Sequence, residues 1–152
     1  MQLLTFDLED DYNLIGIHTS EEDYRLAYLL NKNLSINLVR FKHNLDFENS
    51  KAEFPLFEYK DEQNFTNYYL INNKHRSTEK TNNNSGLFGG TYSSISYLIP
   101  EKKTVDFFLK ITGCNQPRFI SSLVEKLNKI NQVITCYSVE PSTLKSKDHL
   151  IF

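Results

Sequence analysis

The sequence predicts an α+β fold in which a mainly antiparallel sheet carries two helices on one face. Two observations predict this fold. Residues 105–139 read as strand, helix and strand, and residues 12–41 repeat that order more faintly, with a strand hairpin at 54–71 between the two units. Amphipathic helices alternating with strands in this order bury their apolar sides in a two-layer sandwich.

Length and composition fit a single domain spanning residues 1–152. Hydrophobic residues make up 39% of the chain, and the formal net charge is -2. A charge this close to zero provides no broad positive field for nucleic acid or anionic lipid. The acidic N-terminus is not an export signal, and no apolar run is long enough to cross a bilayer. We therefore expect a cytoplasmic protein without membrane contact, in which Cys114 and Cys136 stay reduced.

The N-terminal unit comprises a strand at 12–18, a helix at 21–33 and a strand at 36–41. The segment Thr19-Ser20-Glu21-Glu22 matches a capping box, in which a hydroxyl and a carboxylate satisfy the free N–H groups of a helix start. One face of the helix is apolar at helical spacing, through Leu26, Ala27, Leu30 and Leu34.

The middle of the chain predicts a hairpin followed by a loop. Residues 54–59 and 65–71 are rich in aromatic residues and flank a polar turn, and Pro55 suits a strand start. Residues 72–86 are polar, with Asn72-Asn73 and Asn82-Asn83-Asn84, and predict a mobile loop.

The C-terminal unit is the clearest part of the sequence. Residues 105–111 form an almost unbroken apolar run, the pattern of a strand covered on both faces or at the centre of a sheet. Pro117 suits the first position of a helix that runs to residue 130. The apolar stripe of that helix consists of Phe119, Ile120, Leu123, Val124, Leu127 and Ile130. A return strand follows at 133–139, and residues 141–152 form a short tail. Two such units around a hairpin correspond to a ferredoxin-like arrangement.

One short motif precedes the apolar strand. It consists of Ile99, Pro100 and Glu101, three further residues, and then Val105, Asp106 and Phe107. This stretch resembles the signature of the bacterial IPExxVDY family of small proteins of unknown function. The spacer here is one residue longer than in the family name, and Phe107 replaces Tyr. The resemblance implies no particular activity.

The turn before the second helix resembles the corresponding turn of ACT domains, regulatory modules that often bind amino acids. That turn commonly reads Asp-x-Pro-Gly-x-Leu, and here Asn115 stands at the Asp and Arg118 at the Gly. The resemblance implies an ACT-like sandwich with a small-ligand site at Gly113, Asn115 and Arg118. Asn115 and the helix N–H groups would serve as donors, and Arg118 as an anion partner.

Catalytic and metal signatures are weak. Glu101 and Asp106 could act as an acid–base pair only if both reached one pocket, and a structural role for each is the simpler interpretation. The histidines lack the spacing of metal ligands. These are His18, His43, His75 and His149. We therefore predict neither a catalytic residue, a metal site nor a cofactor.

The sequence favours a non-enzymatic binding or regulatory module that acts through protein contacts or a small ligand. Edge strands and the aromatic hairpin offer a route to a homodimer. The alternative is an RNA-binding accessory protein with an RRM-like element order, although its RNP1 pattern is missing. Its candidate contacts are Lys74, His75, Arg76 and Lys80 for phosphates, and Phe57, Tyr59, Tyr68 and Tyr69 for stacking.

Overall fold

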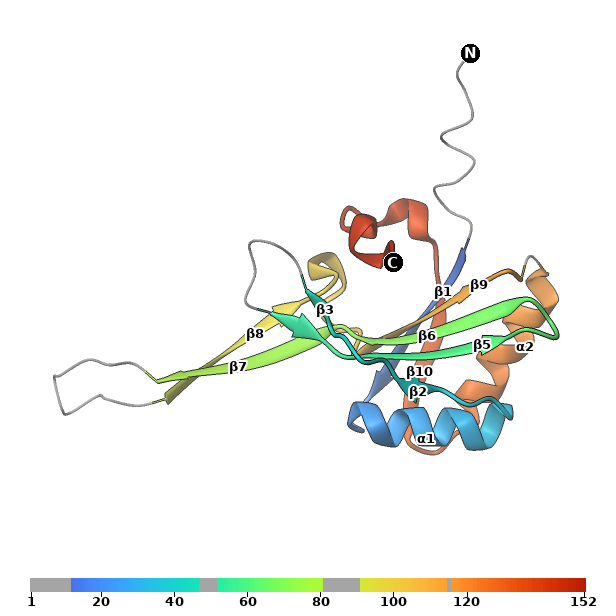
Figure 1. Ribbon diagram of the computed structural model, residues 1–152, viewed down its shortest axis with the longest axis horizontal. Helices are drawn as coiled ribbons and strands as arrows, with labels where there is room; N and C mark the ends of the chain where they lie inside the picture. The colour runs from blue at the N-terminus through green and yellow to red at the C-terminus, as the bar shows by residue number, and fades with distance from the viewer. Residues whose placement is uncertain (1–11, 47–51, 81–90, 115) are drawn as a thin grey trace, which may run out of the picture.

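The computed structural model describes residues 12–46, 52–80, 91–114 and 116–152. Six strands form one sheet in the order β10 (Val133–Val139), β1 (Tyr12–Thr19), β9 (Phe107–Thr112), β6 (Thr66–Asn72), β5 (Leu56–Asp61) and β2 (Val39–Arg40) (Figure 1). Every neighbouring pair in this sheet is antiparallel. Two-stranded sheets pair β3 (Leu45–Asp46) with β4 (Glu53–Phe54), and β7 (Lys74–Lys80) with β8 (Thr91–Tyr97).

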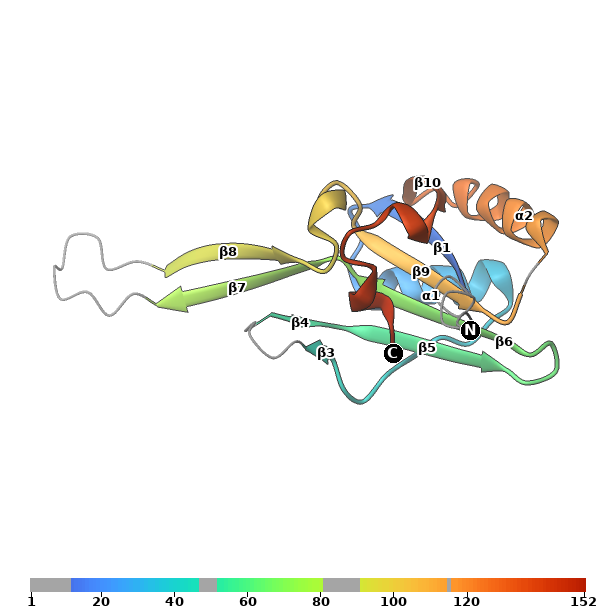
Figure 2. The ribbon, with the colours of Figure 1, turned by 90° about the horizontal axis from the view of Figure 1, so that it is seen from above.

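Two helices, α1 (Asp23–Leu34) and α2 (Pro117–Asn128), cover one face of the six-stranded sheet (Figure 2). Leu26 and Leu30 of α1 belong to the same buried cluster as Leu123 and Leu127 of α2 and the inward side chains of the strands. The predicted α+β fold, with a mainly antiparallel sheet and both helices on one face, is confirmed. The predicted apolar stripe of the second helix lies in this cluster, except that Phe119 and Val124 are partly buried and pack against it.

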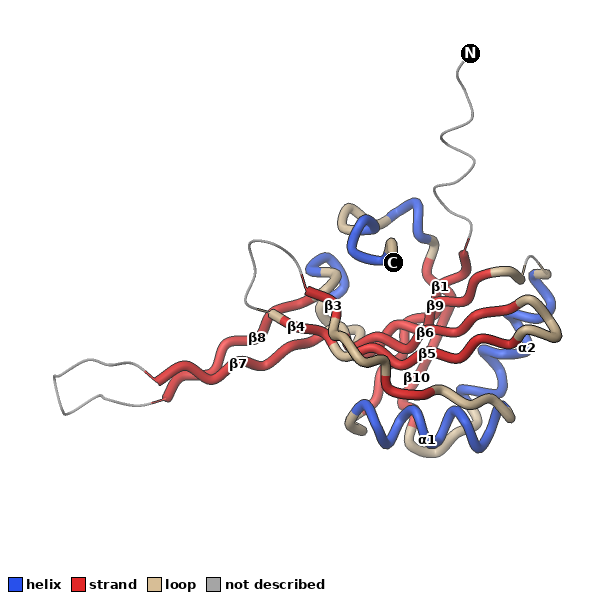
Figure 3. Tube along the Cα trace, in the orientation of Figure 1, coloured by secondary structure: helices blue, strands red, loops and turns tan. Residues whose placement is uncertain are grey.

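The opposite face of the sheet is covered by irregular chain. The 3₁₀ turns at Pro100–Lys102, Pro141–Thr143 and Lys147–Leu150 lie in the segments that cover it (Figure 3). A second buried cluster joins Phe108 of β9 to Ile99, Val105, Leu144 and Leu150. The prediction that residues 105–111 are covered on both faces is therefore confirmed. Residues 141–150, expected as a tail, supply part of this core.

The N-terminal unit differs from its prediction in two places. The helix begins at Asp23 rather than 21, and its N-cap residue, Glu22, makes no side-chain capping bond. The Thr19 hydroxyl instead donates to the Gln132 carbonyl and accepts the Glu21 N–H, so the capping box does not form. The strand expected at 36–41 is only the two residues of β2, and the backbone groups of Leu38, just before it, are bound by a helix side chain.

That side chain belongs to a pair of asparagine clamps, one in each unit. Asn31 of α1 donates to the Leu38 carbonyl at 3.1 Å and accepts the Leu38 N–H at 2.7 Å. Asn128 of α2 does the same for Cys136, at 3.1 and 2.9 Å. Each carboxamide supplies the donor and acceptor that a neighbouring strand would supply. In this respect the two strand–helix–strand units are alike.

The loop expected at 72–86 is a strand over most of its described length. Residues 66–72 form β6, and residues 74–80 continue as β7. At Asn73 the chain changes partners, because β6 pairs with β9 whereas β7 pairs with β8. The β7–β8 ribbon therefore projects from the body as an arm (Figure 1). The strand β7 was missed because residues 74–80 lack apolar alternation, and residues 81–86 lie outside the described part.

Candidate functional site

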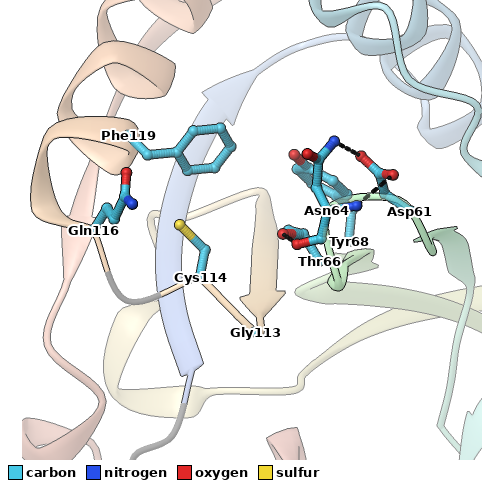
Figure 4. A pocket seen from close by; sticks show the side chains of 8 residues that line it. All are labelled: Asp61, Asn64, Thr66, Tyr68, Gly113, Cys114, Gln116 and Phe119. Carbon is cyan, nitrogen blue, oxygen red and sulfur yellow. Dashed lines mark hydrogen bonds between the residues drawn. The ribbon is translucent and has the colours of Figure 1, made fainter.

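A pocket of about 270 Å³ lies between the β5–β6 turn and the turn that leads from β9 into α2. Figure 4 shows the two groups of side chains that face each other across it. The β5–β6 side supplies Asp61, Asn64, Thr66 and Tyr68, and the other side supplies Gly113, Cys114, Gln116 and Phe119. The lining therefore combines a carboxylate, carboxamides, hydroxyls, a thiol and two aromatic rings.

The β5–β6 wall is held by its own hydrogen bonds. The Asp61 carboxylate accepts the Asn64 N–H at 3.2 Å and the Asn64 side-chain amide at 2.8 Å. The Thr66 hydroxyl donates to the Asn64 carbonyl at 3.0 Å. Phe65, at the tip, has a left-handed backbone with φ of 54°. These bonds hold the turn in one conformation without a bound ligand.

Gly113 allows the two turns to approach each other. Its φ is +86°, and a Cβ atom built there would lie 2.0 Å from the carbonyl oxygen of Phe65. L side chains rarely adopt this backbone, and a carbonyl oxygen at that distance is backbone and not a flexible side chain. A glycine is therefore required for the pocket to have its observed shape.

Tyr68 forms the buried end of the pocket and keeps its proton. Burial raises the pKa of its phenol, and the nearby Asp61, Cys114 and Tyr59 raise it further. Its ring stacks on Tyr59 at a centroid distance of 5.8 Å. A neutral phenol held in one orientation is a hydrogen-bond donor or acceptor for a bound molecule.

Only one of the three predicted ligand residues lines the pocket in the described part of the chain. Gly113 lines the pocket, whereas Arg118 is exposed on α2 and is not part of the lining. Asn115 lies outside the described residues. Sequence reasoning missed the whole β5–β6 wall, although the polar turn was evident, because nothing local indicates which loop will lie opposite.

The motif residues 99–107 form a packed structural segment whose anchor is Asn73, outside the motif. The Asn73 side chain is fully buried, donates to the carbonyls of Lys102 and Val105 at 2.8 Å, and accepts the Ile99 N–H at 2.8 Å. Its backbone N–H donates to the Asp106 carbonyl, and its carbonyl accepts the Leu98 N–H. Ile99 and Val105 are thereby fixed in the second core, each 0% exposed.

The two motif carboxylates hold different elements and do not act on a common group. Glu101 accepts the Ser146 N–H at 2.7 Å and so attaches the segment to the C-terminal part of the chain. Asp106 accepts the Thr19 N–H at 2.9 Å and forms a 2.8 Å ion pair with Lys74. Each bond joins segments distant in sequence, as expected for structural carboxylates. The structural interpretation of the pair is therefore supported.

The residues of the RNA alternative are largely engaged elsewhere. Phe57 and Tyr68 are each 6% exposed and face the helices. Tyr69 packs on the other face, edge-on to Phe152. Lys74 pairs with Asp106, and the His75 ring lies against Phe54. Phe57, Tyr68 and Tyr69 therefore do not form one open stacking surface.

Lys110 is a buried cation inside the second core. It is 5% exposed, and its ammonium donates to the Leu150 carbonyl at 2.5 Å. The rings of Phe152, Tyr12 and Tyr69 surround it at 4.1, 4.9 and 5.7 Å. These ring faces stabilise a cation locally. Burial nevertheless lowers the pKa of Lys110 to about 8.

Within the described ranges, no group of three or more His, Cys, Asp and Glu side chains is arranged to hold a metal ion. No helix there is long and apolar enough to span a membrane. Comparisons with protein-family models, with curated proteins and with solved structures found no match for this chain. The function of the pocket is therefore inferred from its geometry.

The first prediction concerns Gly113. We expect Gly113→Ala to lower the free energy of unfolding by about 2–4 kcal/mol, because strained backbone and a backbone clash add. The matched control is Gly16→Ala, whose Cβ would meet only side-chain atoms, at 3.3 Å or more. Urea unfolding of both variants measures the difference. Equal losses in the two variants would contradict the role assigned to Gly113.

The second prediction concerns Lys110 and pH. Between pH of about 8 and about 10, the unfolded lysine holds a proton that the folded lysine has lost. Folding stability due to Lys110 therefore rises with pH in this window, by about 1 kcal/mol per unit. The Cys136 thiol, with its pKa raised by burial to about 11, acts in the opposite direction.

A Lys110→Met variant separates these contributions, because both proteins keep Cys136. We expect the free energy of unfolding of the parent to rise relative to that of the variant between pH 8 and 10. Parallel stability curves over this range would show that the folded and unfolded lysine titrate alike.

Proposed function

We propose that this protein is a non-catalytic binding or regulatory module that takes a small ligand in the pocket between the β5–β6 and β9–α2 turns. The observation that carries the proposal is the pocket itself, which lies beside the turn that resembles the ligand turn of ACT domains. Its volume, about 270 Å³, is just below the roughly 300–1,000 Å³ of pockets for drug-sized ligands. This size suits a molecule as small as an amino acid.

The order of the strands supports a ferredoxin-like, ACT-like sandwich. The strands β10, β1, β9 and β6 are neighbours in that order, and α1 and α2 follow β1 and β9. A β-α-β-β-α-β chain with its last strand beside its first has this arrangement. In this interpretation β5 and β2 extend the sheet, and the arm is an insertion between β6 and β9.

The chemistry of the lining indicates the class of ligand. The N-cap residue of α2, Gln116, makes no side-chain capping bond, and the first turn contains no acidic residue. A helix start with these properties favours an anionic group such as a carboxylate. Phe119 offers an apolar surface, and Tyr68 and Asn64 offer hydrogen bonds. An amino acid with an apolar side chain combines these features.

The third prediction tests this site by thermal unfolding against a panel of single amino acids. We expect at least one apolar member to raise the melting temperature, by about 2–4 °C for each kcal/mol of binding linkage. Gln116→Ala and Phe119→Ala should reduce that shift. Lys126→Ala, an exposed change elsewhere on α2, should preserve it. No shift with any panel member, or equal shifts in all variants, would overturn the proposal.

Arg118 is tested in the same assay. The sequence predicts that the Arg118 guanidinium pairs with an anionic group of the ligand. Arg118 is exposed in the first turn of α2, the helix whose start borders the pocket. Arg118→Ala should then weaken the shift more than Lys126→Ala does. If the two variants give the same shift, Arg118 takes no part in binding and the lining residues act without it.

A further inference from the structure

The arm formed by β7 and β8 leaves the body of the protein with little support. Figures 1 and 2 show it extending away from the sheet and helices in both views. In the part of the chain that the structure describes, each of these strands pairs only with the other. The outer edge of each strand therefore presents backbone N–H and C=O groups without a strand partner. An isolated two-stranded ribbon is at best marginally stable in water.

The two outer edges differ in charge. The β7 strand includes Lys74, Arg76, Glu79 and Lys80. Charged residues, lysine above all, are the usual means by which an edge strand resists pairing with another chain. The seven residues of β8, Thr91–Tyr97, include no charged residue and no proline. The β8 edge is therefore open to a further strand, whereas the β7 edge is guarded.

The outer strands of the main sheet do not offer an equivalent edge. One outer strand, β2, has only two residues. The other, β10, is also uncharged over Val133–Val139. At its centre, however, the N–H and C=O of Cys136 are both bound to the Asn128 side chain. A strand added to β10 would have to displace that clamp.

We propose that β8 pairs antiparallel with β8 of a second copy of this chain, about a two-fold axis near Ser94. A second copy is the partner indicated, because a neutral edge matches itself under a two-fold axis. The result is a four-stranded ribbon with both guarded β7 strands on the outside, where their like charges are far apart. Ile95, 43% exposed in the single chain, then lies beside the seam. This inference is independent of the ligand pocket.

The fourth prediction uses sedimentation equilibrium of the full chain and two matched charge variants. We expect the parent to be dimeric at about 100 μM, a concentration at which even weak association is populated. Ile95→Lys places a charge at the seam, whereas Thr78→Lys adds the same charge to β7 at a position that does not pair with Ser94. The first variant should raise the dimer dissociation constant about tenfold or more, and the second should leave it nearly unchanged.

A Ser94→Cys variant tests the register of pairing. Under mild oxidation it should form a disulfide-linked dimer that the parent, which retains Cys114 and Cys136, does not form. Hydrogen exchange of the β8 amides should also be slower in the dimer than after dilution to monomer. A monomeric parent at this concentration overturns the proposal. So does a dimer that resists Ile95→Lys while its β8 amides exchange freely, because that interface would lie elsewhere.

Discussion

The hydrogen bonds of one buried asparagine attach the segment 99–105 to the end of β6. Asn73 stands where a long strand leaves the sheet, and its side chain is bound to the backbone of Ile99, Lys102 and Val105. Without those bonds, the Ile99 N–H and the Val105 carbonyl would lose their buried hydrogen-bond partner. The segment they hold closes the second face of the sheet, and Glu101 attaches the C-terminal chain to it. Asn73 therefore links the start of the arm to the second core, to which the C-terminal cover is attached.

The same chemistry recurs in the two asparagine clamps. Asn31 and Asn128 each bind both backbone groups of a residue in the returning chain, Leu38 and Cys136. A carboxamide carries a donor and an acceptor at nearly the spacing of a peptide group, so it can end a ladder that a strand would otherwise continue. The protein thus uses asparagine to satisfy the backbone at three places where strand pairing stops. At β10 this also closes an edge that lacks protective charge.

Parts of the fold could be predicted because their signals are local. The apolar run before Pro117 and the stripe from Phe119 onwards indicate β9 and α2 with little ambiguity. The strand β7 could not be predicted in this way, because its residues are polar on both sides and its partner β8 lies beyond residues 81–90 in the sequence. The motif residues were visible in the sequence, but the asparagine that anchors them lies in a stretch that resembles a polar loop.

Only one of the two walls of the candidate site could be predicted from the sequence. The turn beside Gly113 was indicated by its resemblance to a known ligand turn. The opposite wall, from Asp61 to Tyr68, comes close only because Gly113 lets the Phe65 carbonyl approach. Such a contact depends on a positive φ and on a tertiary approach, and neither is encoded in hydrophobic periodicity. The burial of Lys110 could not be predicted either. The apolar residues around it in the sequence do not indicate that three aromatic rings enclose its ammonium group.

The most direct test of this account is the stability of Asn73→Ala measured by urea unfolding together with amide exchange at Ile99. Loss of three hydrogen bonds, two of them buried, should lower the free energy of unfolding by about 3–5 kcal/mol. The Ile99 amide, which donates to the Asn73 side chain, should then exchange much faster. Asn37→Ala, at an exposed position, serves as the control. A loss below about 1 kcal/mol with an unchanged Ile99 amide would show that the segment is held by other contacts.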